Sequence, residues 1–161
     1  MNTSSLFKRV SAIVMGIVLL VCLNSCAVAK PFPLPVWETY QREIRHEYDF
    51  IHRIKARLQY GLLIVSFTCS NASEQEAIQL KTELQRFFSS EEFLSEYVPF
   101  EDERWRSAGY SGYQMPISDI YIYIYFGSSG ELSCFSDYFV EQYTGNKILT
   151  VDGYQTWIDL S

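Results

Sequence analysis

The stretch SDIYIYIYFGSSGEL, residues 118–132, alternates three isoleucines with three tyrosines and then reaches a Gly-Ser-Ser-Gly segment. Successive residues of a strand point to opposite faces, so the isoleucines share one face and the tyrosines share the other. Isoleucine has no polar atom to keep hydrated, whereas tyrosine can bury its ring and leave its hydroxyl in water. We therefore expect a β-hairpin with its isoleucine face on the core. A symmetric turn would place Tyr125 opposite Leu132 and Tyr123 opposite Cys134.

The residues before this hairpin predict helices around one buried strand. Apolar residues at helical spacing predict a helix over 36–59, and an unbroken apolar run predicts a buried strand over 62–67. Two Ser-x-x-Glu capping boxes, beginning at Ser73 and Ser89, predict a pair of helices that Pro99 brings to an end.

The residues after this helix pair predict a loop and then antiparallel strands. The segment 101–116 has no period and is expected to be a loop. Turn signals divide the remainder into strands over 117–126, 132–143, 147–151 and 154–160. The expected fold class is α+β, with a largely antiparallel sheet of about five strands and with the N-terminal helix and the helix pair on one face.

The first thirty residues have the layout of a secretory signal. Lys8 and Arg9 precede an apolar run from Val10 to Leu23, and small residues follow. A run of about 14 residues makes about 21 Å of helix, which is short of a bilayer core of about 30 Å. A cleaved signal peptide is therefore expected rather than a retained membrane anchor.

Two cleavage sites compete at the end of this segment. The sequence LNSC, ending at Cys26, resembles the lipobox of bacterial lipoproteins, and this resemblance implies a lipid on Cys26. The alternative is ordinary cleavage after Ala29, in the small-x-small sequence AVA, which would give a secreted protein. The expected organisation is a signal peptide over 1–25, a lipid-attachment and proline-rich spacer segment over 26–35, and a single domain over 36–161.

The charge of the chain argues against nucleic acid as a partner. The net charge is −6, and loss of Lys8 and Arg9 with the signal would bring it near −8. Such a domain repels a phosphate backbone, and the sequence suggests no basic stripe that would override this average. The expected partners are the membrane, through the lipid, and a protein or a glycan outside the cytoplasm.

Aromatic side chains supply the candidate contact surface. A row of tyrosines offers large ring surfaces with little rotamer entropy to lose on binding. The alternative is that these rings only stabilise neighbouring strands through cross-strand pairs. The candidate residues are Tyr121, Tyr123 and Tyr125 on the strand, with Trp105, Tyr110 and Tyr113 from the expected loop.

Catalytic and metal-binding patterns are absent from the sequence, so no catalytic residue, cofactor or metal ligand is predicted. His46 and His52 are six residues apart, a spacing that does not place two ligands on one helix face. The expected function is that of a non-catalytic binding module, and the alternative is an envelope enzyme such as a hydrolase. Cys69 and Cys134 remain after processing, and a disulfide between them is expected for an exported protein. The alternative is two buried free thiols.

Overall fold

The computed structural model describes residues 30–59, 61–110, 117–143 and 147–160. The signal segment, Cys26 and Tyr113 lie outside these ranges. The elements in chain order are β1 (Lys30–Pro31), α2 (Pro35–Glu47), β2 (Ile51–Gln59), β3 (Leu62–Cys69), α3 (Glu74–Phe88), α4 (Glu91–Ser107), β4 (Asp119–Phe126), β5 (Gly130–Ser136), β6 (Phe139–Tyr143), β7 (Lys147–Val151) and β8 (Ile158–Asp159).

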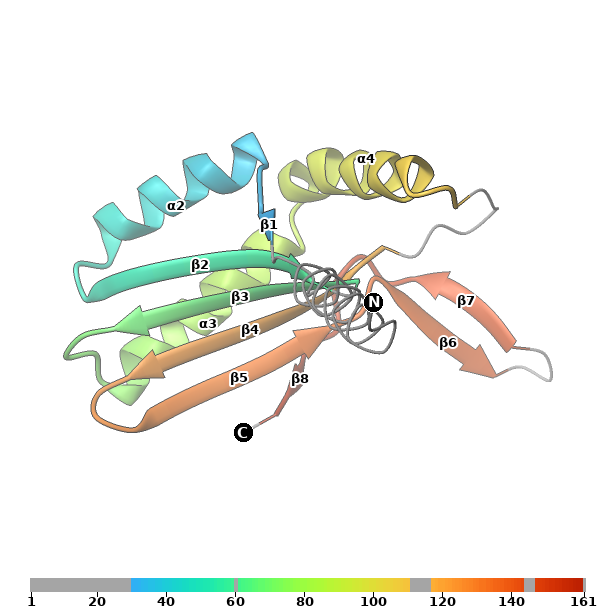
Figure 1. The fold of residues 1–161 in the computed structure, drawn as a ribbon. Coiled ribbons are helices and arrows are strands. Elements are labelled where there is room, and N and C mark those ends of the chain that lie inside the picture. Colours follow the sequence, from blue (N-terminus) through green and yellow to red (C-terminus); the bar gives the residue numbers. More distant parts are fainter. Residues whose placement is uncertain (1–29, 60, 111–116, 144–146, 161) are drawn as a thin grey trace, which may run out of the picture.

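The main sheet is mixed but largely antiparallel, and it confirms the expected α+β class. Its strand order is β1-β2-β3-β4-β5-β8, and only β3 and β4 run parallel, joined by a crossover that contains α3 and α4. The strands β6 and β7 form a separate two-stranded sheet, so the C-terminal strands are not one continuous meander. In Figure 1, this pair projects away from the main sheet.

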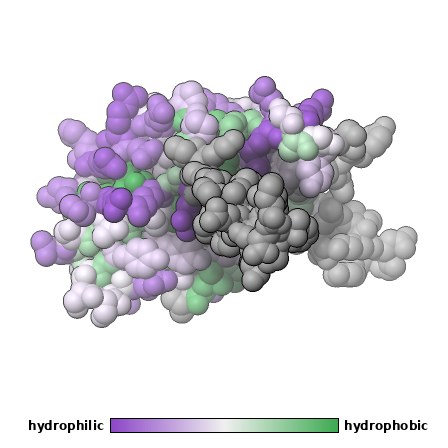
Figure 2. All heavy atoms as spheres, in the orientation of Figure 1, coloured by the Kyte–Doolittle hydropathy of each residue, from purple (hydrophilic) through white to green (hydrophobic). Residues whose placement is uncertain are grey.

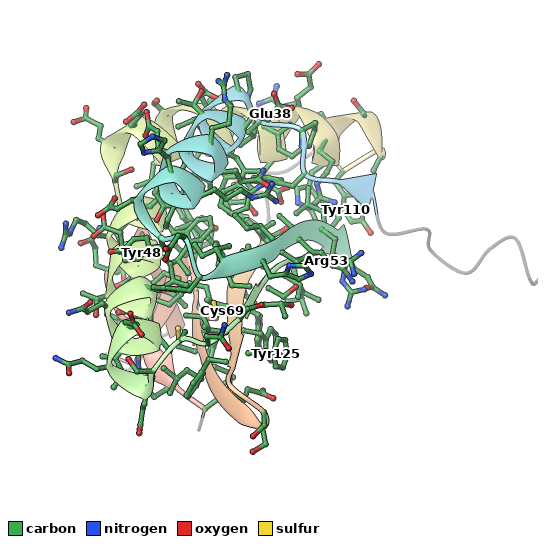
Figure 3. All side chains as sticks on the ribbon, turned by 90° about the vertical axis from the view of Figure 1, so that its left-hand side faces the viewer. Glu38, Tyr48, Arg53, Cys69, Tyr110 and Tyr125 are labelled. Carbon is green, nitrogen blue, oxygen red and sulfur yellow. The ribbon has the colours of Figure 1, made fainter. Side chains whose placement is uncertain are left out.

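The three helices of the described residues, α2, α3 and α4, leave one face of the sheet without a helix from this part of the chain (Figure 1). Figure 1 shows α3 behind the strands, with α2 and α4 along the edge formed by β1 and β2. The face turned toward the viewer carries no helix within the described part of the chain. Figure 3 gives the same arrangement from the side, with α3 on one side of the strands and the side chains of Arg53 and Tyr125 on the other.

The isoleucine face of β4 lies on the core, as predicted. Ile120, Ile122 and Ile124 are fully buried. Alternate residues of β3 are equally buried beside them, because the two strands pair in parallel register. The largest side chains that complete this core are Trp37, Phe67, Phe88, Phe93, Tyr97 and Tyr154.

The predicted helix over 36–59 is wrong beyond Glu47, where α2 ends and β2 follows. The register of β2 against β3 shifts between Ile51 and Arg53, and this bulge inserts one extra residue into β2. As a result Ile51 and Ile54, three residues apart, are both buried. The bulge therefore gives the strand an apolar spacing that is typical of a helix.

The expected loop over 101–116 is also wrong in its first half. The helix α4 continues through Pro99 to Ser107. Proline removes the hydrogen bond to the carbonyl of Ser95, but both residues are exposed and water can replace this bond. The helix then carries Glu101, which is buried, back to the sheet.

The capping predictions for the helix pair are accurate to one residue. Ser73 and Glu76 form the expected capping box at the start of α3. The second helix begins one residue later than predicted, because Ser90 rather than Ser89 accepts the hydrogen bond from the backbone of Phe93.

The register of the β4–β5 hairpin differs by one residue from the symmetric arrangement. Phe126 pairs with Gly130, so the loop contains the three residues 127–129, and Gly127 has a φ of 58°. Glycine adopts this left-handed conformation at no steric cost, because it has no Cβ. Tyr125 consequently lies opposite Glu131, and Ile122 lies opposite Cys134. This places Cys134 on the core face.

The predicted disulfide between Cys69 and Cys134 is wrong, because both cysteines are free and buried. Cys134 of β5 pairs with Ile122 of β4, which pairs in turn with Val65 of β3. Cys69 lies four residues beyond Val65 on β3, so the two cysteines are separated by two strand spacings and by four residues along the strand. Strand geometry makes this about 10 Å across and about 13 Å along the sheet. A disulfide needs Cα atoms within about 7 Å of each other.

Candidate functional site

Three tyrosines form a column along β4, on the sheet face opposite α3 (Figure 3). Tyr121 and Tyr123 are half-buried, and 41% of Tyr125 is exposed. The rings of Tyr123 and Tyr125 are nearly parallel, with centroids 6.4 Å apart and planes at 6°. We call Tyr121, Tyr123 and Tyr125 the tyrosine column.

The strand beside this column extends the aromatic surface. Phe135 lies directly opposite Tyr121 in the β4–β5 pair. Their rings stack with centroids 5.3 Å apart and planes at 14°. Ile158 of β8 pairs with Phe135 in turn and is 49% exposed. The result is a continuous apolar row across three strands.

A column of basic residues lies on the same face, on β2. Arg53, Lys55 and Arg57 alternate with inward-facing residues and are all exposed. Figure 3 shows Arg53 and Tyr125 projecting to the same side of the sheet. We call Arg53, Lys55 and Arg57 the basic column.

The expected helix over 36–59 includes these three residues, so the sequence does not predict the basic column. The signal was nonetheless present in the sequence RIKARL, residues 53–58, where basic and apolar residues alternate with the period of a half-buried strand. The bulge at the start of β2 breaks this alternation between Ile51 and Arg53, so the period of two is visible only from Arg53 onward.

The strand register places the two columns in matching rows. Short or apolar residues of β3 separate each basic residue from its tyrosine. The rows are Arg53–Thr68–Tyr125, Lys55–Ser66–Tyr123 and Arg57–Ile64–Tyr121. We call these nine residues the outer sheet face. In Figure 2, strongly hydrophilic side chains lie over α2 and β2, and paler ones lie over β4 and β5.

Acidic residues border the outer sheet face on the β5 side. Glu131 is exposed opposite Tyr125. Asp119 and Asp137 share a hydrogen bond at the other end of the tyrosine column. Burial, followed by the negative charge of Asp137, raises the pKa of Asp119 to about 6. Burial and then the charge of Asp119 raise the pKa of Tyr121 as well.

The other predicted contact residues are arranged differently. Trp105 is half-buried on α4, where its indole nitrogen donates a hydrogen bond to Glu101 and the guanidinium of Arg104 lies 4.5 Å from its ring centre. Tyr110 is 57% exposed and meets the Trp105 ring edge-on, with centroids 5.0 Å apart. Tyr113 lies outside the described residues. Trp105 therefore belongs to a cluster that holds α4 in place.

The carboxylate of Glu101 is the most deeply buried acidic group among the described residues. Arg104 donates to both of its oxygens, at 2.8 and 2.7 Å. The hydroxyl and the backbone amide of Ser118 donate to Oε2, at 2.7 and 3.2 Å. These hydrogen bonds fix the start of β4, so this carboxylate has a structural role.

Two features are absent from the described residues. Within them, no group of three His, Cys, Asp or Glu residues is placed to hold a metal ion. No helix in the same part of the chain has both the length and the apolar character needed to span a bilayer.

The chain matches no protein-family model, and comparisons with curated proteins and with solved structures find no significant similarity.

Proposed function

We propose that the protein is an exported binding module, tethered to a membrane by a lipid on Cys26, that engages its partner through the outer sheet face. The basic, apolar and small-residue order of the first thirty residues supports export, and the sequence LNSC supports the tether. Cleavage after Ala29 is the alternative, and it would leave the binding role unchanged in a secreted protein.

The observation that carries the binding role is the alignment of two chemically different columns on one face of the sheet. A sheet face that packs against solvent alone needs polar side chains but no particular order among them. Here, each of three rows pairs one cation with one tyrosine across the same strand. Tyrosine and arginine are the residue types most enriched in binding surfaces, where they supply much of the affinity.

The polar chemistry of this face favours binding over catalysis. Its nine residues supply three cations and five hydroxyls. The carboxyl group of Asp119, whose pKa is raised to about 6, lies at the end of the tyrosine column and outside these nine residues. The deeply buried Glu101 carboxylate is occupied by hydrogen bonds from its neighbours.

Site-specific photocrosslinking in a bacterial host tests this proposal. A photoreactive amino acid at Tyr123 should give a crosslinked product in the membrane fraction, identified by mass spectrometry. The same group at Ile78, which is 44% exposed on α3, is the matched control and should give none. No product from Tyr123, or the same product from both positions, would contradict the proposed use of this face.

A further inference from the structure

We propose that the ligand of the outer sheet face is a linear polysaccharide that carries acidic groups and lies along β3 between the basic and tyrosine columns. This inference rests on the proposed function and names the chemical class of the ligand.

The charge of the face determines where the acidic groups of the ligand lie. Arg53, Lys55 and Arg57 are exposed on β2, whereas Glu131 borders the face beyond the tyrosines. An anionic ligand is attracted to the β2 side and repelled from the β5 side. The ligand is therefore held over β3, with its anions toward the basic column.

The small side chains of β3 leave room for a chain in this position. Neighbouring strands are about 4.8 Å apart, so the basic and tyrosine columns stand about 9.6 Å apart at the backbone. Thr68 and Ser66 lie between them and present hydroxyl groups instead of long side chains. Hydroxyl groups can both donate and accept hydrogen bonds, which suits a ligand that is itself rich in hydroxyls.

The tyrosines provide the apolar contact that a sugar ring requires. Each ring offers a flat surface, and the hydroxyls of Tyr123 and Tyr125 can remain hydrated because these side chains are only partly buried. A sugar ring combines an apolar face of C–H groups with a polar rim. The face of the ring can stack on tyrosine while its rim reaches the hydroxyls of β3.

The acidic character of the chain argues against single-stranded nucleic acid. Every nucleotide carries an ionised phosphate, and the net charge of the chain is already −6. A polysaccharide also offers hydroxyl groups along its length, which match the hydroxyls of Ser66 and Thr68.

Binding measurements on the full chain in detergent micelles test this inference, with fluorescently labelled polygalacturonate as the probe. Neutral dextran, an oligo-dT strand and poly-L-glutamate are compared at several salt concentrations. The parent protein should bind polygalacturonate, more weakly as salt is raised, and should bind the other three at least tenfold more weakly.

Two sets of variants assign the binding to the two columns. Replacing Arg53, Lys55 and Arg57 with Gln should reduce polygalacturonate affinity at least tenfold and remove most of its salt dependence. The control replaces three exposed arginines on the helices, Arg42, Arg45 and Arg86, with Gln, which changes the net charge equally and should leave affinity unchanged.

The tyrosine variants separate stacking from charge. Tyr123→Ser combined with Tyr125→Ser should reduce affinity at least tenfold while the salt dependence persists. The control, Tyr48→Ser, removes a half-buried tyrosine on the helix side of the sheet, as Figure 3 shows, and should bind as the parent does. Far-UV circular dichroism establishes that each variant is folded.

Several outcomes would overturn the inference while leaving the proposed function in place. Equal or tighter binding of oligo-dT or poly-L-glutamate would assign the face to another polyanion. Absence of polygalacturonate binding would exclude the acidic glycan, and a crosslink from Tyr123 to a protein would then still support a binding module. A concentration-dependent dimer that the tyrosine variants abolish would show that a second copy covers the face.

Discussion

The carboxylate of Glu101 and the hydroxyl of Ser118 are joined by a hydrogen bond of 2.7 Å between α4 and the residue that precedes β4. The same carboxylate oxygen accepts the backbone amide of Ser118 at 3.2 Å. Tyr154 donates its own hydroxyl to the carbonyl of Ser118, at 2.6 Å. The tyrosine column begins at Tyr121, three residues after Ser118. This buried contact with α4 therefore fixes the position of β4 and of the outer sheet face.

We expect Glu101→Ala to lower the free energy of unfolding by about 3 to 5 kcal/mol, because it leaves the half-buried guanidinium of Arg104 and the buried Ser118 without their acceptor. Urea denaturation of the parent and the variant measures this difference. Glu103→Ala, an exposed position on the same helix, is the control and should change stability by less than about 0.5 kcal/mol. Similar losses in both variants would show that the buried network contributes little.

The fold class and the buried face of β4 could be predicted because each depends on local patterns that tertiary structure did not override. The alternation of isoleucine and tyrosine is enough to assign two faces, and the capping box at Ser73 is enough to start a helix. The bulge in β2 is different, because an inserted residue changes the period of the strand and depends on the partner strand. Because of this bulge, the apolar spacing around Ile51 resembles that of a helix, and the sequence predicts neither β2 nor the basic column.

The contacts of the site depend on register, which the sequence left open. The sequence Gly-Ser-Ser-Gly is compatible with hairpin loops of two, three or four residues. A change of one residue in loop length shifts the strand register and changes every cross-strand partner. The pairing of Tyr121 with Phe135 and the distance between Cys69 and Cys134 both follow from the observed register. Similarly, the helix beyond Pro99 carries Glu101, which accepts a hydrogen bond from Ser118 outside the local segment.

The two faces of β4 should differ in their tolerance of truncation. Ile122→Ala should cost about 2 to 5 kcal/mol, since Ile122 is fully buried and its loss leaves a cavity. Tyr123→Ala should cost about 1 kcal/mol or less, because it removes mainly cross-strand contacts. Denaturant melts of the two variants make the comparison, and a larger loss for Tyr123 would show that the outer face contributes more to folding than its burial indicates.

The two free thiols should be unreactive in the folded protein. Burial raises the pKa of both Cys69 and Cys134 to about 11, so almost no thiolate is present at neutral pH. Iodoacetamide applied without reductant should modify neither residue in the native state and both after unfolding in urea, as peptide mapping would show. Recovery of a linked Cys69–Cys134 peptide under non-reducing conditions would contradict the free state.

The carboxyl pair beside Tyr121 should give the protein a measurable pH dependence. The folded protein holds the Asp119 proton more tightly than the unfolded chain, because its pKa is raised to about 6. Stability from this group is therefore present at pH 4 and is lost as the pH rises through 6. Asp119→Asn should match the parent near pH 4 and exceed its free energy of unfolding by about 1 kcal/mol at pH 7, after allowance for solvent screening. Urea melts across this range measure the difference, and parallel curves for the two proteins would contradict it.

The proposed tether can be tested apart from the binding face. When the full chain is expressed in a bacterial host, it should fractionate with membranes and carry a lipid on Cys26, because the sequence LNSC follows an apolar signal core. Intact mass spectrometry of the detergent-extracted protein should show the lipid adduct on a chain that begins at Cys26. Cys26→Ala should abolish the adduct and release or block processing of the protein, whereas Cys22→Ala, four residues earlier, is the matched control and should leave the adduct intact. An unmodified chain that begins at Lys30 would instead assign cleavage to Ala29 and make the protein a secreted one.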